Sequence, residues 1–229
     1  MRLEKASFKA IKYACLNFHY AKRVPAQPLC GYSIFNNKSE WCGVIVFNNG
    51  VGNIEKPFNL KKGEVCELVR IALNGKQDKT SRALSIALKL FKKHNPLVKL
   101  IVSYADSDFH KGTLYKASNF IYIGSKKTGN EYIYNNKSVH SRSISKTGYS
   151  KQFGIFRKTI KKKDCEVIKK GVKHKFIYFL DKNEKQKYFK NINASKKAGS
   201  QEPLDSGRCN PDLDAPINNN NINLIKKIS

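Results

Sequence analysis

The sequence predicts an α+β fold of α/β-like character: a mixed, mostly antiparallel central sheet flanked by helices, with a basic C-terminal extension. Up to about residue 135, apolar runs of strand length alternate with amphipathic segments of helix length, which is typical of a sheet covered by helices. From residue 136 onward, lysine clusters alternate with aromatic residues instead. We therefore expect a core at 1–135, a basic, aromatic-rich extension packed on it at 136–194, and a flexible tail rich in Asn, Asp, Pro and Ser at 195–229.

The first expected element is an amphipathic helix at 5–18. Apolar residues recur there at intervals of three and four: Phe8, Ile11, Cys15 and Phe18. This helix would present His19 and Tyr20 at its C-terminal end, before the proline-bearing loop AKRVPAQP at 21–28. A histidine in this position can cap backbone carbonyl groups or belong to a site, and both readings stay open.

Two buried strands are expected next, WCGVIVF at 41–47 and EVCELVRIAL at 64–73. Strict alternation along the second strand would place four side chains on one face: Cys66, Leu68, Arg70 and Ala72. An arginine inside such a strand is unfavourable unless it has an anionic partner or reaches the edge of the sheet. Arg70 is therefore a candidate for binding an anion.

A helix with a phosphate-binding type of N-terminus is expected after a short polar loop. Its apolar stripe consists of Leu84, Ala87, Leu88 and Phe91. Thr80 or Ser81 would cap its start, and Lys79 and Arg82 add positive charge beside the free amides of the first turn. Most capped helices bind no ligand, so this interpretation needs support from elsewhere. The sequence contains no GxxxxGK[ST] segment, which excludes a nucleotide-binding P-loop.

Asp106 comes directly after the apolar strand LVKLIVSY at 97–104. Ligands of α/β sheets collect outside the carboxyl ends of strands, and His110 and Tyr115 follow within one or two turns of chain. Simpler explanations exist, because Asp106 could cap a short helix and Tyr115 could be a core residue. A further apolar strand begins at IYIG, 121–124.

The charge predicts a polyanionic partner. The chain has 44 Lys and Arg against 17 Asp and Glu, a formal net charge of +27, and such a surface attracts nucleic acid. A lysine-rich proteome is the alternative explanation. No apolar stretch approaches the roughly 18–20 residues of a membrane span, and the N-terminus has no apolar signal region. The six cysteines are scattered without a CxxC pair, as expected for free thiols in a reducing cytosol.

The predicted extension combines aromatic side chains with cations that suit contacts to a DNA backbone. The candidates for phosphate contacts are Arg142, Lys161, Lys162, Lys163 and Lys173. HKFIYFL at 174–180 is expected to be a strand that pairs back onto the core.

Four segments together resemble a known family. They are FHYAKRVP (18–25), ELVRIAL (67–73), SRALSIALKLFKKHNP (81–96) and SYADSDFHKGTLYKASNFIYIG (103–124). Their order and spacing resemble the Mom family of bacteriophage DNA-modification proteins, which has the fold of the acyl-CoA N-acyltransferases (GNAT). The similarity covers roughly residues 10–145 and includes VHSRS at 139–143.

The resemblance implies an enzyme that converts adenine in duplex DNA to an N6-carbamoylmethyl, or acetamido-type, derivative. This modification would protect phage DNA from restriction enzymes in the cytoplasm of the bacterial host. Acetyl-CoA and iron are the implied cofactors. The implied catalytic residues are His19, Tyr20, Asp106 and Tyr115, with His19 and Asp106 also as iron ligands. The implied cofactor-binding residues are Arg70, Thr80, Ser81 and Arg82.

The chemistry of adenine explains why such a cluster would be needed. The N6 lone pair is delocalised into the ring, so a carboxylate that hydrogen-bonds the amine could help to remove its proton. The base must also leave the duplex, and an aromatic side chain such as Tyr20 could stack on it. Two alternatives remain. One is a basic GNAT N-acetyltransferase acting on aminoacyl-tRNA or protein amines, and the other is a DNA-binding protein without chemistry. QDKTSRA at 77–83 lacks the glycines of the usual GNAT pyrophosphate loop QxxGxG/A.

Overall fold

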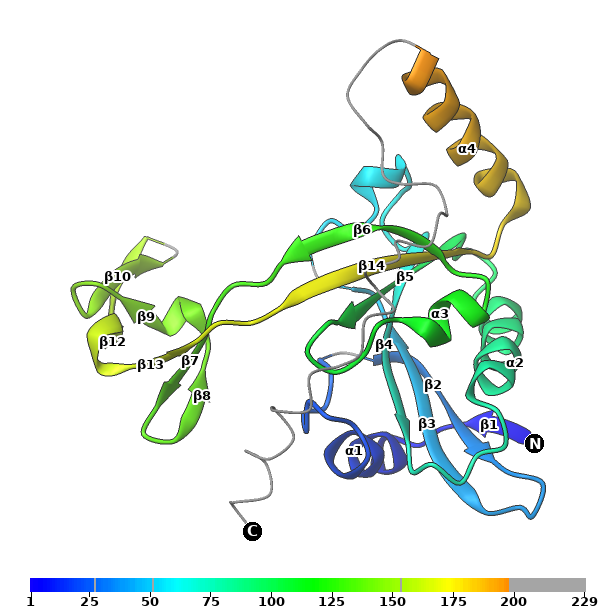
Figure 1. Ribbon diagram of the computed structural model, residues 1–229, viewed down its shortest axis with the longest axis horizontal. Coiled ribbons are helices and arrows are strands. Elements are labelled where there is room, and N and C mark those ends of the chain that lie inside the picture. Colours follow the sequence, from blue (N-terminus) through cyan, green and yellow to red (C-terminus); the bar gives the residue numbers. More distant parts are fainter. Residues whose placement is uncertain (27, 51, 153, 198–229) are drawn as a thin grey trace.

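The centre of the molecule is a seven-stranded mixed sheet (Figure 1). In this computed structural model the described residues are 1–26, 28–50, 52–152 and 154–197. The strand order is β1-β2-β3-β4-β5-β14-β6, and only β4 and β5 are parallel neighbours. The strands are β1 (Arg2–Lys5), β2 (Pro28–Phe35), β3 (Trp41–Asn48), β4 (Val65–Leu73), β5 (Leu100–Asp106), β6 (Ile121–Lys127) and β14 (Val172–Phe179). The predicted α+β class with a mixed, mostly antiparallel sheet is confirmed.

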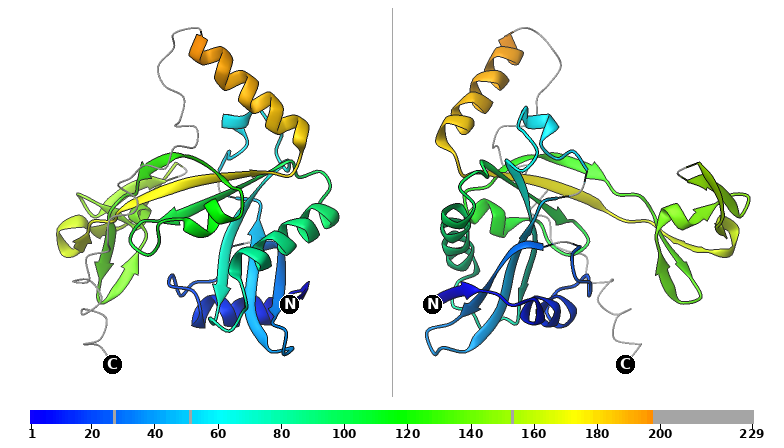
Figure 2. Two further views of the ribbon diagram at one scale, coloured as in Figure 1. Left: turned by 45° about the vertical axis from the view of Figure 1, so that its right-hand side comes forward. Right: turned by 180° about the vertical axis from the view of Figure 1, so that it is seen from behind.

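Helices cover both faces of this sheet (Figures 1 and 2). They are α1 (Phe8–Asn17), α2 (Thr80–His94), α3 (Thr113–Ala117) and α4 (Lys182–Lys197). Ile11, Ala14 and Cys15 of α1 pack on β3 and β4, whereas Phe8, which the sequence places in the same stripe, is exposed. α2 and α3 pack on the opposite face with the larger core cluster. A 3-10 turn, η1 (Lys56–Phe58), lies near α4. None of the helices in the described part of the chain has the length and hydropathy of a membrane span.

The parallel strands β4 and β5 diverge halfway along their length. They pair from Val65 opposite Leu100 to Leu68 opposite Ser103, and the pairing then stops although both strands continue. β4 also carries a bulge, because Val46 of β3 pairs with Arg70 while Phe47 pairs with Leu68. The bulge inserts one extra residue into the alternation of β4.

Because of this bulge, the side chains of β4 beyond Leu68 lie on other faces of the sheet than the sequence predicts. Cys66 and Leu68 face the α2 side as expected, but beyond the bulge Ile71 and Leu73 take that side. Ala72 packs on the α1 side instead. Strict alternation therefore fails after Leu68, and Arg70 turns away from the face that the sequence predicts for it.

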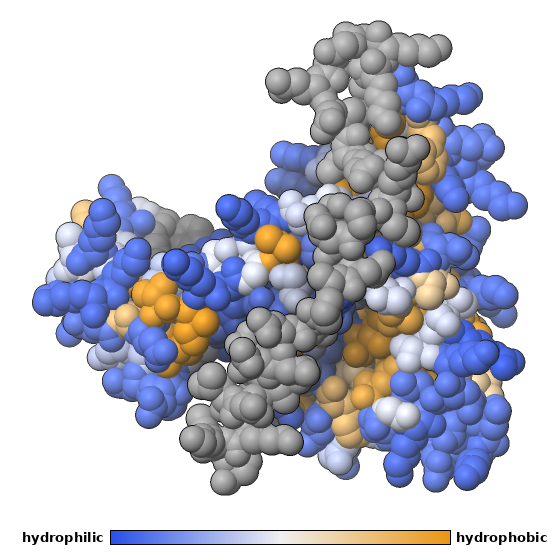
Figure 3. All heavy atoms as spheres, viewed as in Figure 1, coloured by the Kyte–Doolittle hydropathy of each residue, from blue (hydrophilic) through white to orange (hydrophobic). Residues whose placement is uncertain are grey.

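Residues 128–171 form an arm that projects from the end of the sheet (Figures 1 and 2). The arm is inserted between β6 and β14, which are neighbours in the sheet. Its strands are β7 (Glu131–Tyr134), β8 (Lys137–Val139), β9 (Ile144–Ser145), β10 (Tyr149–Gln152), β11 (Ile155–Lys158), β12 (Ile160–Lys161) and β13 (Glu166–Ile168), with 3-10 turns η2 (Ser141–Ser143) and η3 (Lys162–Asp164). The sequence of the arm has eleven Lys and Arg against three Asp and Glu. The face of the arm seen in Figure 3 is mainly hydrophilic and includes an apolar patch.

The root of the arm is hydrogen-bonded to the turn that follows β5. The amide of Gly171 donates to Asp108 Oδ2 at 3.1 Å, and the amide of Val172 donates to Ser107 Oγ at 2.9 Å. The amide of Ser107 in turn donates to the carbonyl oxygen of Val172 at 3.0 Å. The arm is thus connected to the same turn that carries Asp106.

The range 136–194 contains more than the arm. β14 falls inside it and is a central strand of the core sheet, as expected from HKFIYFL. The helix α4 extends to Lys197, so it includes the first residues of the predicted tail, and 198–229 lie outside the described residues. Five cysteines in the described part of the chain are free thiols, whereas Cys209 lies outside it.

Candidate functional site

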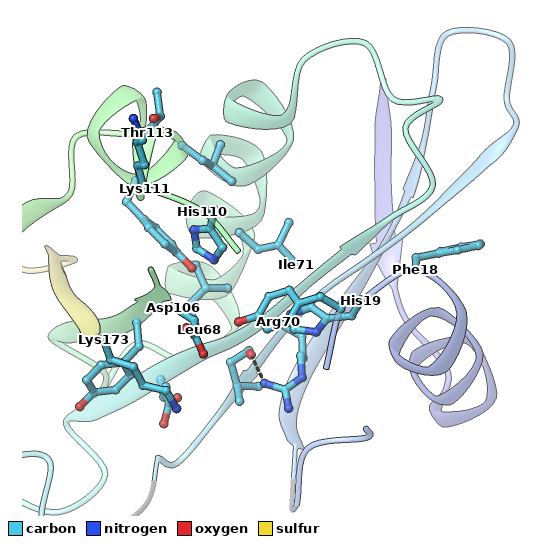
Figure 4. Close-up of a pocket in the computed structure, with 16 residues that line it drawn as sticks. Phe18, His19, Leu68, Arg70, Ile71, Asp106, His110, Lys111, Thr113 and Lys173 are labelled. Atoms are coloured by element: carbon cyan, nitrogen blue, oxygen red, sulfur yellow. Dashed lines mark hydrogen bonds between the residues drawn. The ribbon is translucent and has the colours of Figure 1, made fainter. Parts of the chain in front are cut away.

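A cavity of about 380 Å³ lies where β4 and β5 diverge. Four separate parts of the chain line it: the end of α1, the middle of β4, the segment from β5 to α3, and the start of β14. Most of the predicted catalytic and cofactor-binding side chains meet here, namely His19, Tyr20, Arg70, Asp106 and Tyr115. Figure 4 shows His19 and Arg70 side by side, with Asp106 and His110 reaching the cavity from the β5 side.

His19 is held as a neutral imidazole with a known tautomer. Its Nδ1 accepts a hydrogen bond from the amide of Ala21 at 3.1 Å, so the ring proton is on Nε2. Burial, together with the positive charge of Arg70 and the nearby His110, lowers the pKa of His19 to about 4. At neutral pH the side chain therefore offers the cavity an N–H donor without a charge.

Arg70 supplies positive charge to the cavity, together with Lys111 and Lys173. Its Nη1 donates to the carbonyl oxygen of Val69 at 2.7 Å, and its Nε lies 3.5 Å from the carbonyl oxygen of Arg23. Among the ion pairs of the described residues, none includes Arg70. Since a guanidinium has five N–H donors, Arg70 retains donors and charge for an anionic ligand.

Asp106 ends β5 and lines the cavity with its carboxylate. Its Oδ1 accepts a hydrogen bond from the amide of Asp108 at 3.2 Å, so it stabilises the turn after the strand. It does not cap α3, whose N-cap is Gly112. The predicted alternative of a cap on α3 is therefore wrong, but Asp106 does have a structural role in the turn, which it fills with Oδ1.

Aromatic rings form the rim of the cavity beside Asp106. The ring of Tyr20 stacks on Phe109, with ring centroids 4.0 Å apart and an interplanar angle of 18°. On its other side, its centroid lies 4.2 Å from that of His19. Burial and the negative charge of Asp106 raise the pKa of Tyr20, so its hydroxyl stays protonated at neutral pH.

Tyr115 closes the inner end of the cavity where the strands separate. The Ser103 hydroxyl lies 2.9 Å from the carbonyl oxygen of Leu68 and 2.9 Å from the Tyr115 hydroxyl. Ser103 has one proton to donate and a carbonyl can only accept, so both bonds form when Tyr115 donates to Ser103. Burial raises the pKa of Tyr115 to about 12, which keeps it protonated.

Sequence reasoning did not assign five polar residues of the cavity, which are Glu67, Tyr104, His110, Lys111 and Thr113. Burial raises the pKa of Glu67 and lowers that of His110. His110 and Lys111 lie between Asp106 and Tyr115 in the sequence, so their position could have identified them as cavity residues. Nothing in the sequence identifies Glu67 as a cavity residue, because strict alternation places it on the face opposite Arg70. The bulge of β4 brings both side chains to one cavity.

The predicted phosphate-binding residues Thr80, Ser81 and Arg82 do not line this cavity. They form the first turn of α2, where Lys79 is the N-cap and no side chain caps the helix. The expected cap by Thr80 or Ser81 is therefore wrong, because Thr80 Oγ1 accepts a hydrogen bond from Gln77 Nε2 at 2.9 Å instead. The first turn consequently keeps free amides, which is the condition for binding an anion.

The predicted iron ligands His19 and Asp106 do not fit an iron site. Nδ1 of His19 accepts the amide of Ala21, so Nε2 carries the proton and is not free to ligate a metal. Across the described ranges, no group of three or more His, Cys, Asp or Glu is arranged to hold a metal ion. We derive no step through iron.

The predicted DNA contacts divide between two places. Arg142, Lys161, Lys162 and Lys163 lie on the arm. Lys173 lies at the start of β14 opposite Asp106 and lines the cavity. The sequence could not separate these positions, because the arm's chain returns to the sheet at β14.

The sheet order, with one parallel pair that diverges around a cavity and a helix crossing between its two strands, defines a GNAT-like fold. Within that class, the chain belongs to the Mom protein family, whose model matches residues 1–197. No curated protein matches the chain.

Solved structures similar to the chain are acetyltransferases at low sequence identity. An acetyltransferase of Bacillus subtilis in complex with CoA has 12% identity and a TM-score of 0.44, over 79% of this chain and 99% of that chain. A GNAT family acetyltransferase of Elizabethkingia anophelis with acetyl-CoA bound has 12% identity and a TM-score of 0.43, over 78% and 97%. The spermidine/spermine N-acetyltransferase of Vibrio cholerae has 10% identity and a TM-score of 0.40, over 83% and 95%.

Proposed function

We propose that this protein is a DNA-modifying transferase that converts adenine in duplex DNA to its N6-carbamoylmethyl derivative. In this role it would act in the cytoplasm of a phage-infected bacterium and protect phage DNA from host restriction. The observation that carries the proposal is the meeting of His19, Tyr20, Arg70, Asp106 and Tyr115 in one cavity, together with membership of the Mom family.

Asp106 is the candidate for activating the adenine amine. An exocyclic amine that loses its proton during attack needs a nearby carboxylate to accept a hydrogen bond from it. Asp106 lines the cavity with a carboxylate oxygen that its turn does not use. Glu67 is the other carboxylate of the cavity, but burial raises its pKa, which favours its protonated form.

His19 and Tyr115 are both neutral side chains around the same space, but Tyr115 donates its hydroxyl proton to Ser103, so the donor offered to a ligand is the Nε2–H group of His19. Neither becomes charged near neutral pH, since the pKa of His19 is about 4 and that of Tyr115 about 12. Fixed neutral donors can stabilise negative charge that develops on a carbonyl oxygen during group transfer. Phe109 and His19 cover the two sides of the Tyr20 ring, so the predicted stacking of a base on Tyr20 is not supported, and Tyr20 would meet an everted base at the rim with its edge or its hydroxyl.

A CoA-type cofactor fits the arrangement of α2 and β4. The uncapped first turn of α2, with Thr80, Ser81 and Arg82, would hold its diphosphate, and Arg70 would bind an anionic group nearer the cavity. When bound, acetyl-CoA would supply the two carbons and release CoA as a thiol, while the amide nitrogen and the two-electron oxidation at the methyl carbon would need an ammonia-type nitrogen donor and an oxidant as co-substrates. The diverging strands β4 and β5 leave room for an extended chain between these two places.

Duplex DNA is the proposed partner because positive charge surrounds the cavity. The arm, which projects beyond the sheet, carries part of this charge. Its cations include Arg142, Lys161, Lys162 and Lys163. Lys111 and Lys173 line the cavity itself. A backbone bound along the arm would thus meet further cations where a base enters the cavity.

Nucleoside mass spectrometry tests the proposal directly. Plasmid DNA is isolated from cells that express the wild type, Asp106→Asn or Glu4→Gln, a control in an exposed carboxylate on the edge strand β1. The wild type and Glu4→Gln should yield a deoxyadenosine species with the mass of a carbamoylmethyl adduct. Asp106→Asn should yield none while remaining folded, because the Asn oxygen can still accept the amide of Asp108.

Unmodified DNA from cells that contain soluble wild-type protein would reject DNA modification. That result would favour N-acetyl transfer to aminoacyl-tRNA or protein amines, to be sought in the same cells. Full modification by Asp106→Asn would remove Asp106 from the mechanism.

A further inference from the structure

One face of the ribbon formed by β10 and β11 consists of alternating rings and lysines. Tyr149 pairs with Lys158, and Lys151 pairs with Phe156. Directly opposite residues, and residues two apart on one strand, lie on the same side of a sheet. These four side chains therefore share one face, which we call the ring–lysine face.

The ring–lysine face is uncovered. Phe156 is 74% exposed and Tyr149 is 58% exposed, and both lysines are exposed. The ribbon is a two-stranded sheet that pairs with no third strand in the described part of the arm. Leaving two neighbouring aromatic rings exposed to water is unfavourable, so this face is suited to a partner that covers both rings.

A hollow of about 660 Å³ adjoins the same face. Tyr149 and Lys158 form its boundary with the ribbon, and its other lining includes the ring of Tyr134, the cation of Lys161 and the carboxylate of Asp164. Hydroxyl groups of Ser143, Thr147 and Thr159 complete the lining. Rings, cations and small hydroxyls together are the side chains that contact bases, phosphates and sugars.

We propose that the ring–lysine face and the adjoining hollow bind unpaired nucleotides. Bases stack on Tyr149 and Phe156, and the connecting phosphates contact Lys151 and Lys158. Tyr149 and Phe156 are diagonal neighbours in the ribbon, and such positions are about 7–8 Å apart, so each ring can present a face to a base. A base inside a duplex is already stacked on both sides, so this face selects nucleotides that have left a duplex.

The inference deepens the proposed function and rests on it for the choice of DNA as the first ligand. An enzyme that everts adenine leaves the opposite strand locally unpaired, and the arm projects beside the sheet end that carries Asp106. Unpaired RNA presents the same rings and phosphates, so the test includes both polymers.

The test compares three labelled ligands by fluorescence anisotropy: a short single DNA strand, the same strand annealed to its complement, and the RNA strand of the same sequence. The Tyr149→Ala/Phe156→Ala double variant loses two stacking rings and should bind the single strands at least roughly 30-fold more weakly than the wild type does. Its duplex affinity should change little, because duplex binding depends on phosphate contacts. Phe8→Ala is the matched control, since Phe8 is an exposed ring (62%) on α1 of the core.

A variant that keeps an aromatic ring distinguishes the loss of stacking from the loss of contact area. Phe156→Trp keeps a ring and should keep the affinity, and the new indole should change its fluorescence when a single strand is added. The wild type contains one tryptophan, Trp41, whose signal provides the background. A loss confined to RNA, or to DNA, supports the site and identifies its natural ligand.

Two results would overturn the inference. One is an unchanged affinity of the double variant for both single strands. The other is an equal loss for single strands and duplex, which would make the ribbon a duplex contact. Nucleoside analysis of the cellular DNA is independent of these measurements, so a failure of the proposed modification is seen separately from a failure of this site.

Discussion

The neutral state of His19 predicts how the stability of the protein depends on pH. The pKa of His19 is about 4 in the folded chain, against an ordinary value of 6.5. The unfolded chain therefore binds a proton more readily over this range. The stability that neutral His19 contributes is complete above pH 6.5 and is lost as the pH falls toward 4. At about 1.4 kcal/mol per pKa unit, this loss amounts to about 3 kcal/mol.

His19→Gln tests this reasoning, because Gln has no proton to take up. The free energy of unfolding is measured with urea at neutral pH and near pH 4. The wild type should lose about 3 kcal/mol more than His19→Gln between the two conditions. His140→Gln, a change in an exposed histidine of the arm, should behave like the wild type. Equal losses in the wild type and His19→Gln would refute the assignment of His19 as a neutral donor.

Three further outcomes are expected. Arg70→Met should raise the pKa of His19, because the positive charge of Arg70 helps to lower that pKa. An unchanged midpoint in an NMR titration of His19 would contradict this. Gly171→Ala should destabilise the root of the arm by about 1–3 kcal/mol, since a Cβ there would lie 2.3 Å from Asp108 Oδ1 and from Ser107 Oγ. Gly129→Ala, where a Cβ meets nothing within 4 Å, is the control in the same urea measurements. Replacing Lys161, Lys162 and Lys163 by Gln should weaken duplex binding and lower the salt slope by about 0.9 for each phosphate that the variant no longer neutralises. A slope equal to that of the wild type would place these lysines away from the DNA.

The sequence predicted best those parts of the fold that depend on local pattern. The helix α2 and the strands β3, β4 and β5 follow from periodicity, since each buries one stripe or a whole run of apolar residues. The site residues were found through short segments, such as the one with Asp106 and Tyr115. These segments keep their residues close together in space because the strand end and the next helix are joined by a short turn.

Features that depend on pairing between distant segments could not be predicted. The bulge of β4 arises from its register with β3, and it decides that Glu67 and Arg70 reach one cavity. The place of β14 between β5 and β6 depends on two partners more than 40 residues earlier in the chain. The strands of the arm are two to four residues long, too short to leave a periodic signal.

The insertion of the arm between two paired strands has a mechanical consequence. A module on one linker can swivel, but this arm is held by β6 and β14, which are hydrogen-bonded to each other, while β14 is also bonded to β5. The lengths of these strands therefore fix the distance between the arm and Asp106. Lengthening both strands by two residues would shift the arm by about 7 Å, the rise of roughly two base pairs along the proposed duplex. In the proposed complex with duplex DNA, the lengths of β6 and β14 would set the distance between the phosphates bound by the arm and the base in the cavity.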